Sequence, residues 1–334
     1  MKNPTVVFTK AKEVQLLDRE VKQPVKDEYL VKTRASLISI GTELTILSGE
    51  FPPNSSWSAY GVFPFDAGYC AIGEVMEAGP DADKELVGKK VATWGVHSLY
   101  NTLPGKILYP INRKVADDES VFFAIALIVM NGVRMGNVVW GESVVIYGMG
   151  LLGQFAARLA RIAGARPVFC VDVSDERLAL LPDDPALIKI NPKKDDVLET
   201  VKAKNSGRKA DVVIELTGNQ DLIPSEFAAL KDQGRFVVLS SPRGPTKFDF
   251  HDLCNAHSYN IIGAHTGAAP QVETPYNQWT RARSAELYFN QLADGELNIK
   301  NMVSKKVSYK DAPQAYYDLL KDRSKTMGVI IEWK

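Results

Sequence analysis

Three glycines and one acidic residue form the part of this sequence whose residue types and spacing are best suited to chemistry. Gly148, Gly150 and Gly153 have the spacing G-x-G-x-x-G, and Asp172 lies 24 residues after the first of them. In a dinucleotide-binding loop the first glycine permits a tight turn, the second lets the backbone approach a pyrophosphate, and the third lets the next helix pack closely on the sheet. A carboxylate at the place of Asp172 takes the ribose hydroxyls of the adenosine.

We therefore predict NAD as the cofactor, because a 2′-phosphate of NADP would meet like charge at Asp172. The alternative is a flavodoxin-like βαβ unit that binds no nucleotide. The predicted contacts are the whole loop and the acid: Gly148, Met149, Gly150, Leu151, Leu152, Gly153 and Asp172.

The elements around the loop have the order that such a site needs. Val144–Tyr147 is a short apolar run typical of a buried parallel strand. From Leu151 apolar residues recur at helical intervals until Gly164, and a second apolar run covers Val168–Val171. The helix N-terminus offers free N–H groups and a partial positive charge to phosphates.

This alternation continues along the chain and predicts an α/β fold with a doubly wound parallel sheet. Further strands are expected at Ala186–Ile190, Asp211–Leu216, Arg235–Ser240 and Tyr259–Gly263, and helices at Asp117–Val139, from Ser174, at Lys193–Ala203 and at Leu222–Lys231. Thr217 and Ser240 end two of these strands on the ligand side. Each is either a cofactor contact or an ordinary turn residue.

The segments on either side of this α/β region have a different pattern. Residues 5–110 are β-rich, with no long amphipathic helix, and the tail contains two helix and two strand patterns. Expected strands are Thr5–Phe8, Glu28–Thr33, Gly73–Met76, Lys90–Thr93, Val303–Tyr309 and Gly328–Trp333, and expected tail helices are Trp279–Leu292 and Asp311–Asp322. We expect a nucleotide domain at 124–267 inserted into a β-rich domain of 1–123 and 268–334.

Composition narrows the partners to small molecules. The 334 residues are 45% hydrophobic and 24% charged, and 40 basic side chains balance 40 acidic ones. This balance gives no footprint for nucleic acid or an anionic membrane. The longest apolar run, Val121–Met130, is far short of the roughly 20 residues of a membrane span. The start M-K-N-P-T-V-V-F lacks a signal-peptide core, and three cysteines lack C-x-x-C spacing, so a cytoplasmic protein is expected.

Several blocks resemble the medium-chain dehydrogenase/reductase superfamily, and the resemblance covers the whole chain. They are I-G-T-E-L at Ile40–Leu44, G-Y-C-A-I-G-E-V at Gly68–Val75, V-G-K-K-V-A at Val87–Ala92, the G-M-G-L-L-G loop, and the tail segment V-S-Y-K-D-A-P-Q-A-Y-Y-D-L-L. The resemblance implies a GroES-like catalytic domain and a Rossmann domain, with Arg177 over the adenine. It also implies a homodimer or homotetramer, paired through Tyr259–Gly263 or the segment after Asn298.

The metal site is where this chain departs from its zinc-containing relatives. They carry a ligand Cys where this chain has Ile40, a His where it has Tyr69, and then a Glu where it has Cys70. A third ligand is expected in Phe122–Met130, which has no polar side chain, and Thr93–Pro104 lacks the cysteines of the structural zinc lobe. Catalytic zinc needs three protein ligands, so we predict no zinc. The blocks are similar to the zinc-free branch grouped with bacteriochlorophyllide hydroxyethyl dehydrogenases.

Without zinc, side chains must polarise the substrate oxygen and move its proton. The resemblance puts Thr42 at the proton-relay position and Glu43 at that of an acid behind the site, although either can simply hold a turn or loop. Tyr69 can donate to the substrate oxygen or merely fill the old metal site. His97, in a loop that relatives bring to the cleft, is either a general acid/base or structural.

We expect an NAD-dependent, zinc-independent alcohol dehydrogenase or ketone reductase. Reduction of an activated C=C bond and a non-catalytic dinucleotide-binding protein are the alternatives. The aromatic side chains of Phe51–Phe65 either line a pocket for a bulky or aromatic substrate or pack over the domain's own core.

Overall fold

The computed structural model describes residues 2–334, which separate into two compact units. Unit 1 combines the N-terminal part up to Ala124 with Pro270–Lys334, and unit 2 is Ile125–Ala269. Each unit has its own sheets. Within residues 2–334, no helix is long and apolar enough to cross a membrane.

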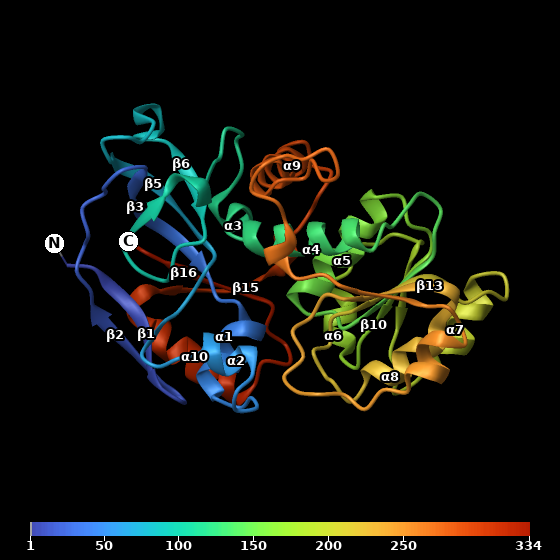
Figure 1. The fold of residues 1–334 in the computed structure, drawn as a ribbon. Coiled ribbons are helices and arrows are strands. Elements are labelled where there is room, and N and C mark those ends of the chain that lie inside the picture. Colours follow the sequence, from blue (N-terminus) through green and yellow to red (C-terminus); the bar gives the residue numbers. More distant parts are fainter. Residues whose placement is uncertain (1) are drawn as a thin grey trace. The chain divides into compact units, whose positions relative to one another are not determined.

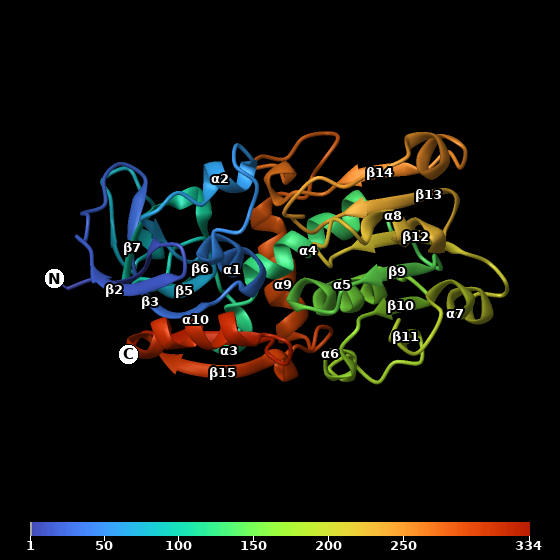
Figure 2. The ribbon, with the colours of Figure 1, turned by 90° about the horizontal axis from the view of Figure 1, so that it is seen from below.

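Unit 2 is built on a parallel sheet of six strands with the order β11-β10-β9-β12-β13-β14, visible from one edge to the other in Figure 2. The strands are β9 (Val144–Tyr147), β10 (Val168–Val171), β11 (Leu187–Ile190), β12 (Ala210–Glu215), β13 (Leu230–Val238) and β14 (Asn260–Gly263). The helices are α4 (Phe123–Met135), which begins in unit 1, α5 (Leu151–Ile162), α6 (Asp175–Ala179), α7 (Val197–Lys204) and α8 (Ile223–Glu226). The predicted doubly wound parallel sheet is confirmed.

One helix predicted for unit 2 is wrong over most of its length. The segment Leu222–Lys231 was expected to be helical throughout, but α8 ends at Glu226, a 3₁₀ turn covers Phe227–Ala229, and β13 begins at Leu230. Leu230 is fully buried and pairs with Ala210 of β12. Tertiary burial of this side chain in the sheet therefore overrides a helix-like spacing of apolar residues.

Unit 1 contains two sheets. The larger has the order β15-β16-β3-β5-β6-β8, with β7 also paired to β3, and the smaller has the order β2-β1-β4. The strands are β1 (Pro4–Lys10), β2 (Glu13–Asp18), β3 (Glu28–Leu37), β4 (Phe65–Asp66), β5 (Ala71–Ala78), β6 (Lys90–Thr93), β7 (Tyr100–Pro104), β8 (Leu108–Pro110), β15 (Val303–Ser308) and β16 (Gly328–Glu332). The helices are α1 (Ile40–Ser48), α2 (Ser56–Tyr60), α3 (Asp117–Ser120), α9 (Arg281–Ala293) and α10 (Ala312–Lys321).

Helix α1 has no counterpart among the predicted elements of residues 5–110, where the sequence showed no long amphipathic helix pattern. Its apolar side chains do not make one stripe, because the helix is buried on most of its surface. It ends at Gly49, whose φ of +69° is the left-handed conformation that glycine adopts at helix ends. Helix α1 lies beside α10, as Figures 1 and 2 show, so it depends on packing rather than on amphipathic patterning.

The core of unit 2 encloses a carboxyl group that lacks a partner. Glu226 is 2% exposed, and neither of its carboxyl oxygens has a hydrogen-bond partner among the described residues. Burial, with the nearby charge of Glu215, raises the pKa of Glu226 to about 9. Because the ionised form is disfavoured in this place, Glu226 keeps its proton at neutral pH.

This raised pKa predicts a stability that falls as pH rises. Below about pH 4.5 both states are protonated, whereas between 4.5 and 9 the unfolded chain releases a proton that folded Glu226 retains. Glu226→Gln should therefore raise the free energy of unfolding at pH 8 by about 1–3 kcal/mol and flatten its pH dependence. Urea unfolding from pH 5 to 8 measures this. The exposed control Glu296→Gln should leave the curve unchanged, and an unaltered slope in Glu226→Gln would contradict the assignment.

Candidate functional site

The glycine loop of unit 2 has the three local geometries that its spacing predicts. Gly148 has a φ of +94°, and a Cβ there would lie 2.8 Å from the backbone of Leu216. A Cβ on Gly153 would lie 1.8 Å from the carbonyl oxygen of Gly148, so α5 can approach the turn only without a side chain. A Cβ on Gly150 would meet nothing within 4 Å. The backbone at Gly150 is therefore open to a ligand, as a pyrophosphate site requires.

Asp172 is tied to this loop by its own carboxylate. It is 7% exposed, and its Oδ2 accepts a hydrogen bond from the Met149 N–H at 2.7 Å. Its Oδ1 accepts from the Ser174 N–H at 2.8 Å, and Nη1 of Arg177 lies 3.7 Å from Oδ2. The acid thus joins the end of β10 to the loop and carries Arg177 beside it, which brings together three of the predicted contacts.

Thr217 and Ser240 both donate hydrogen bonds to Glu215, a residue that was not predicted from the sequence. Glu215, the fully buried last residue of β12, accepts hydrogen bonds from the Thr217 hydroxyl at 2.7 Å and from the Gly218 N–H at 2.8 Å. The Ser240 hydroxyl donates to its other oxygen. Glu215 therefore fixes the ends of β12 and β13 to one another. An acid inside the apolar run D-V-V-I-E-L was the available signal.

The two glycines of the loop predict different defects when each is replaced by alanine. Gly153→Ala places a Cβ on backbone and should lower the free energy of unfolding by about 1–3 kcal/mol. Gly150→Ala should leave stability unchanged but weaken NADH binding at least tenfold, because its methyl group occupies the ligand's space. Thermal unfolding and NADH fluorescence titration measure the two effects. Equal effects of both variants on both readouts would contradict this reading of the loop.

In unit 1, the buried carboxylate of Glu43 is linked by hydrogen bonds to His97 and, through Ser39, to Tyr69, two of the other residues predicted to be catalytic. Glu43 is 1% exposed, and its Oε1 accepts from the Ser39 N–H at 2.8 Å. Its Oε2 contacts Nε2 of His97 at 3.1 Å and accepts from the Tyr316 hydroxyl. The Ser39 hydroxyl in turn lies 2.5 Å from the Tyr69 hydroxyl.

Tyr69 lies at the end of this chain of polar groups. Burial raises the pKa of the Tyr69 phenol well above its usual value, and nearby Cys70 adds to the shift, while hydrogen bonds from Ser39 and Thr42 oppose it. The partly exposed Thr42 is thus adjacent to the Tyr69 hydroxyl. The phenol keeps its proton and can act as a hydrogen-bond donor to a substrate oxygen.

His97 lies behind this group and not at a surface. It is fully buried, and its Nδ1 lies 2.8 Å from the Ser36 hydroxyl, which also accepts from Nε1 of Trp333 at 2.8 Å. The Nε2–H tautomer satisfies every one of these groups, since Nε2 then donates to Glu43 and Nδ1 accepts from Ser36. The structure thus places His97 as a support for Glu43, with no solvent contact of its own.

Sequence reasoning missed the partners of this group because they are remote in the chain. Ser36 is the last residue but one of β3, Tyr316 lies on α10 and Trp333 follows β16. A hydroxyl or indole in an apolar run gives no signal of its own, and only the fold brings these side chains to Glu43.

The side chains at the superfamily's usual metal position do not fit a zinc ion. Ile40 supplies only carbon atoms, the Tyr69 phenol is bonded to Ser39, and Cys70 is a single buried thiol. Across residues 2–334, no group of three His, Cys, Asp or Glu side chains could hold a metal ion. A catalytic zinc needs three protein ligands and an open position, so no step is assigned to a metal here.

The aromatic segment packs largely on unit 1 itself. Trp57, Phe63 and Phe65 pack against the buried cluster that contains Phe8, and the Phe51 ring stacks on Trp57 with centroids 6.5 Å apart. These contacts favour the packing interpretation of the segment over a substrate pocket.

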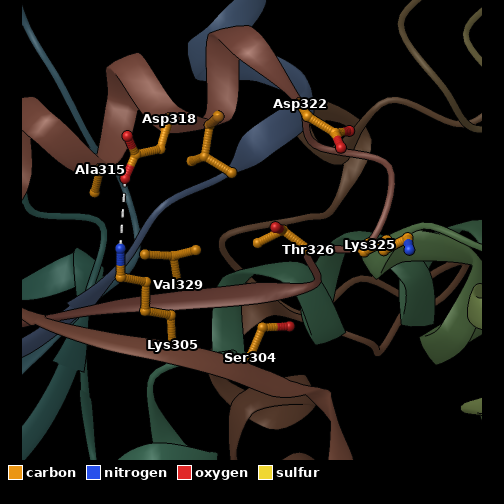
Figure 3. A pocket seen from close by; sticks show the side chains of 9 residues that line it. Ser304, Lys305, Ala315, Asp318, Asp322, Lys325, Thr326 and Val329 are labelled. Carbon is orange, nitrogen blue, oxygen red and sulfur yellow. Dashed lines mark ion pairs between the residues drawn. The ribbon is translucent and has the colours of Figure 1, made fainter.

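A surface pocket of about 320 Å³ lies elsewhere in unit 1, between α10 and the strands β15 and β16 (Figure 3). Lys305 and Asp318 face one another across it at 3.5 Å. None of the predicted site residues lines it, and its opposite charges neutralise each other, so we do not take it as the functional site.

Comparison with known proteins finds similar sequences over nearly the whole chain. Residues 152–282 match the family model described as zinc-binding dehydrogenase. The chain is 26% identical to D-guloside 3-dehydrogenase of Escherichia coli K12 over 97% of its own length and 99% of that protein. The chain is therefore similar, over nearly its whole length, to dehydrogenases of the medium-chain dehydrogenase/reductase superfamily. Relatives named as dehydrogenases support an oxidoreductase.

Solved structures share the fold of this protein over nearly the whole chain. An alcohol dehydrogenase of Escherichia coli CFT073 in complex with NADH has a TM-score of 0.83 at 17% identity, with 99% of both chains covered. A quinone oxidoreductase of Pseudomonas syringae has a TM-score of 0.80 at 21% identity, covering 99% of this chain and 100% of that one. The GroES-like and Rossmann units expected from the sequence are thereby confirmed.

Proposed function

We propose that this protein is a zinc-independent, NAD(H)-dependent dehydrogenase that interconverts an alcohol and a ketone. The observation that carries the proposal is the Tyr69 phenol, which occupies a zinc-ligand position of the superfamily and is hydrogen-bonded to Ser39 and Thr42. A protonated phenol held by two hydroxyls supplies the hydrogen-bond donor that a carbonyl oxygen needs when no metal polarises it.

In the reduction of a ketone, the residues of unit 1 have different roles. Tyr69 donates its hydrogen bond to the carbonyl oxygen and gives up the proton as negative charge develops there. Thr42, partly exposed beside the phenol, relays a proton from solvent to the phenolate and takes up a proton from water as it gives up its own, so that both hydroxyls end the cycle protonated. Glu43 and His97 act through Ser39, whose backbone N–H is bonded to Glu43 while its side chain holds the phenol.

The glycine loop of unit 2 would hold the dinucleotide, which supplies or accepts the hydride. The open backbone at Gly150 and the N-terminus of α5 suit its pyrophosphate, and Asp172 with Arg177 suits the adenosine. A carboxylate at this position repels a 2′-phosphate, which supports NAD over NADP. Structures with the same fold have been solved with NADH and with NADP, which supports a nicotinamide cofactor, and the choice of NAD rests on Asp172 alone.

Removal of the phenol should slow turnover more than it weakens binding. Tyr69→Phe keeps the ring stacked on Trp94 but removes the donor, so kcat should fall about 10²–10³-fold with little change in KM. Steady-state kinetics on a panel of secondary alcohols and ketones measure this. Tyr60→Phe, a change at an exposed tyrosine of the same unit, is the control. An unchanged kcat in Tyr69→Phe would contradict the proposed role of Tyr69 as hydrogen-bond donor to the substrate.

Cofactor preference tests the second half of the proposal. The wild-type protein should use NADH at least tenfold better than NADPH by kcat/KM. Asp172→Asn should lower this preference for NADH, because it removes the negative charge and keeps one of the two oxygens that accept backbone N–H groups. A wild-type preference for NADPH would contradict the assignment.

Reduction of an activated C=C bond is the second candidate, favoured by the shared fold with a quinone oxidoreductase. Product analysis on enones separates the two, since one activity gives an allylic alcohol and the other a saturated ketone. Dinucleotide binding without turnover on any of these compounds would instead indicate a non-catalytic protein.

We further propose a cytoplasmic homodimer or homotetramer acting on a small molecule. Strand β14 ends the described sheet of unit 2 and is largely exposed, so it can pair with its copy in a second chain.

A further inference from the structure

A second cluster of polar side chains lies next to Tyr69 in unit 1. Trp94 follows β6, Tyr109 is in β8 and Arg281 begins α9. The guanidinium carbon of Arg281 lies 5.4 Å from the centroid of the Trp94 ring. Burial raises the pKa of the Tyr109 phenol, and the proximity of Trp94 and Arg281 opposes that shift. Three hydrogen-bond donors from three separate elements therefore meet at one place.

Two of these donors are buried without an acceptor. The Tyr109 hydroxyl, on a side chain that is 3% exposed, and Nε1 of Trp94 have no hydrogen-bond partner within residues 2–334. An unsatisfied buried polar group costs about 1–3 kcal/mol, and such groups in a native protein point to a missing partner. The indole N–H of Trp94 can only donate. The missing partner must therefore bring an acceptor.

Charge identifies the kind of acceptor. Arg281 adds a permanent positive charge to the two neutral donors, and its face lies over the indole ring. A planar carboxylate has two oxygens and up to four acceptor positions, which matches a guanidinium together with one N–H and one O–H donor. An apolar group would leave the Trp94 and Tyr109 donors unpaired, and a neutral alcohol would bring no negative charge to the guanidinium of Arg281.

The cluster is in direct contact with the proposed catalytic phenol through the ring of Trp94. The Trp94 ring stacks on that of Tyr69 with centroids 5.8 Å apart and an interplanar angle of 14°, and Phe123 meets its edge at 5.9 Å. A small molecule that reaches both groups must carry its carboxylate a few bonds from its hydroxyl or keto carbon.

We infer that Trp94, Tyr109 and Arg281 bind the carboxylate of the substrate, so that the protein acts on a hydroxy acid and the corresponding keto acid. The carboxylate site stands on the cluster itself, whereas the assignment of the reacting oxygen to Tyr69 rests on the proposed function.

Matched ligands that differ only in charge test the site. We would titrate the NAD-saturated protein with 2-, 3- and 4-hydroxybutanoate and with the corresponding neutral amides, using isothermal titration calorimetry. At least one of the acids should bind tenfold or more tightly than its amide. Tyr109→Phe and Arg281→Gln should each remove most of that preference, and Arg281→Lys should restore part of it.

A neighbouring arginine provides the control. Arg283 lies on the same helix, and its guanidinium carbon is 4.2 Å from the ring centroid of Trp279, so Arg283→Gln removes equal charge from an equivalent pairing. It should leave the preference unchanged. Equal binding of every acid and its amide would overturn the inference. So would a preference that survives in both Tyr109→Phe and Arg281→Gln, or one that Arg283→Gln also abolishes.

Turnover of the same ligands separates this inference from the proposed function. Selective binding of an acid without any NADH formation would support the carboxylate site and contradict the dehydrogenase role of Tyr69. Turnover of neutral alcohols with no preference for the acids would support that role and overturn the carboxylate site.

Discussion

The buried carboxylate of Glu43 is the interaction on which the candidate site of unit 1 depends. A carboxylate taken out of water is costly unless hydrogen bonds replace its hydration. Ser39, His97 and Tyr316 provide those bonds from three parts of the chain. The requirement to satisfy one charge thus fixes the start of α1, the loop before β7 and the face of α10 relative to one another, and Tyr69 is held through Ser39.

In unit 2, buried carboxylates likewise accept hydrogen bonds at the ends of the strands. Asp172 accepts backbone N–H groups of the glycine loop and of the turn after β10, and Glu215 accepts groups from the ends of β12 and β13. In both units, acids that would be expensive if unpaired define the position of loops that carry function. Glu226 is the exception, because it is equally buried but lacks such partners and keeps its proton instead.

The sequence was sufficient to predict strands and turns that depend on neighbouring residues. It was not sufficient to predict contacts between side chains that are far apart in the chain. Val144–Tyr147 and Val168–Val171 are strands with the predicted bounds, because short apolar runs next to a glycine turn specify their own structure. Helix α1 was missed since it is buried on most sides and lacks a polar face. Nothing in the sequence indicated the roles of Tyr316 and Trp333 or the pairing of Trp94 with Arg281. Each of these contacts joins residues that are distant in the chain and that no motif connects.

A chain with the superfamily's fold but an altered set of polar groups can perform the same reaction class only if those groups replace the ion. In the mechanism that we propose, the phenol of Tyr69 takes the place of the metal as the group that polarises the substrate oxygen, and the neighbouring hydroxyls take the place of the metal-bound water as the route for protons.

The most direct measurement is zinc content determined alongside turnover on the same purified sample. The account predicts NADH-linked activity on an alcohol or a ketone that persists after exhaustive chelation, at far less than one zinc ion per chain. Activity that rises and falls in proportion to bound zinc would contradict it.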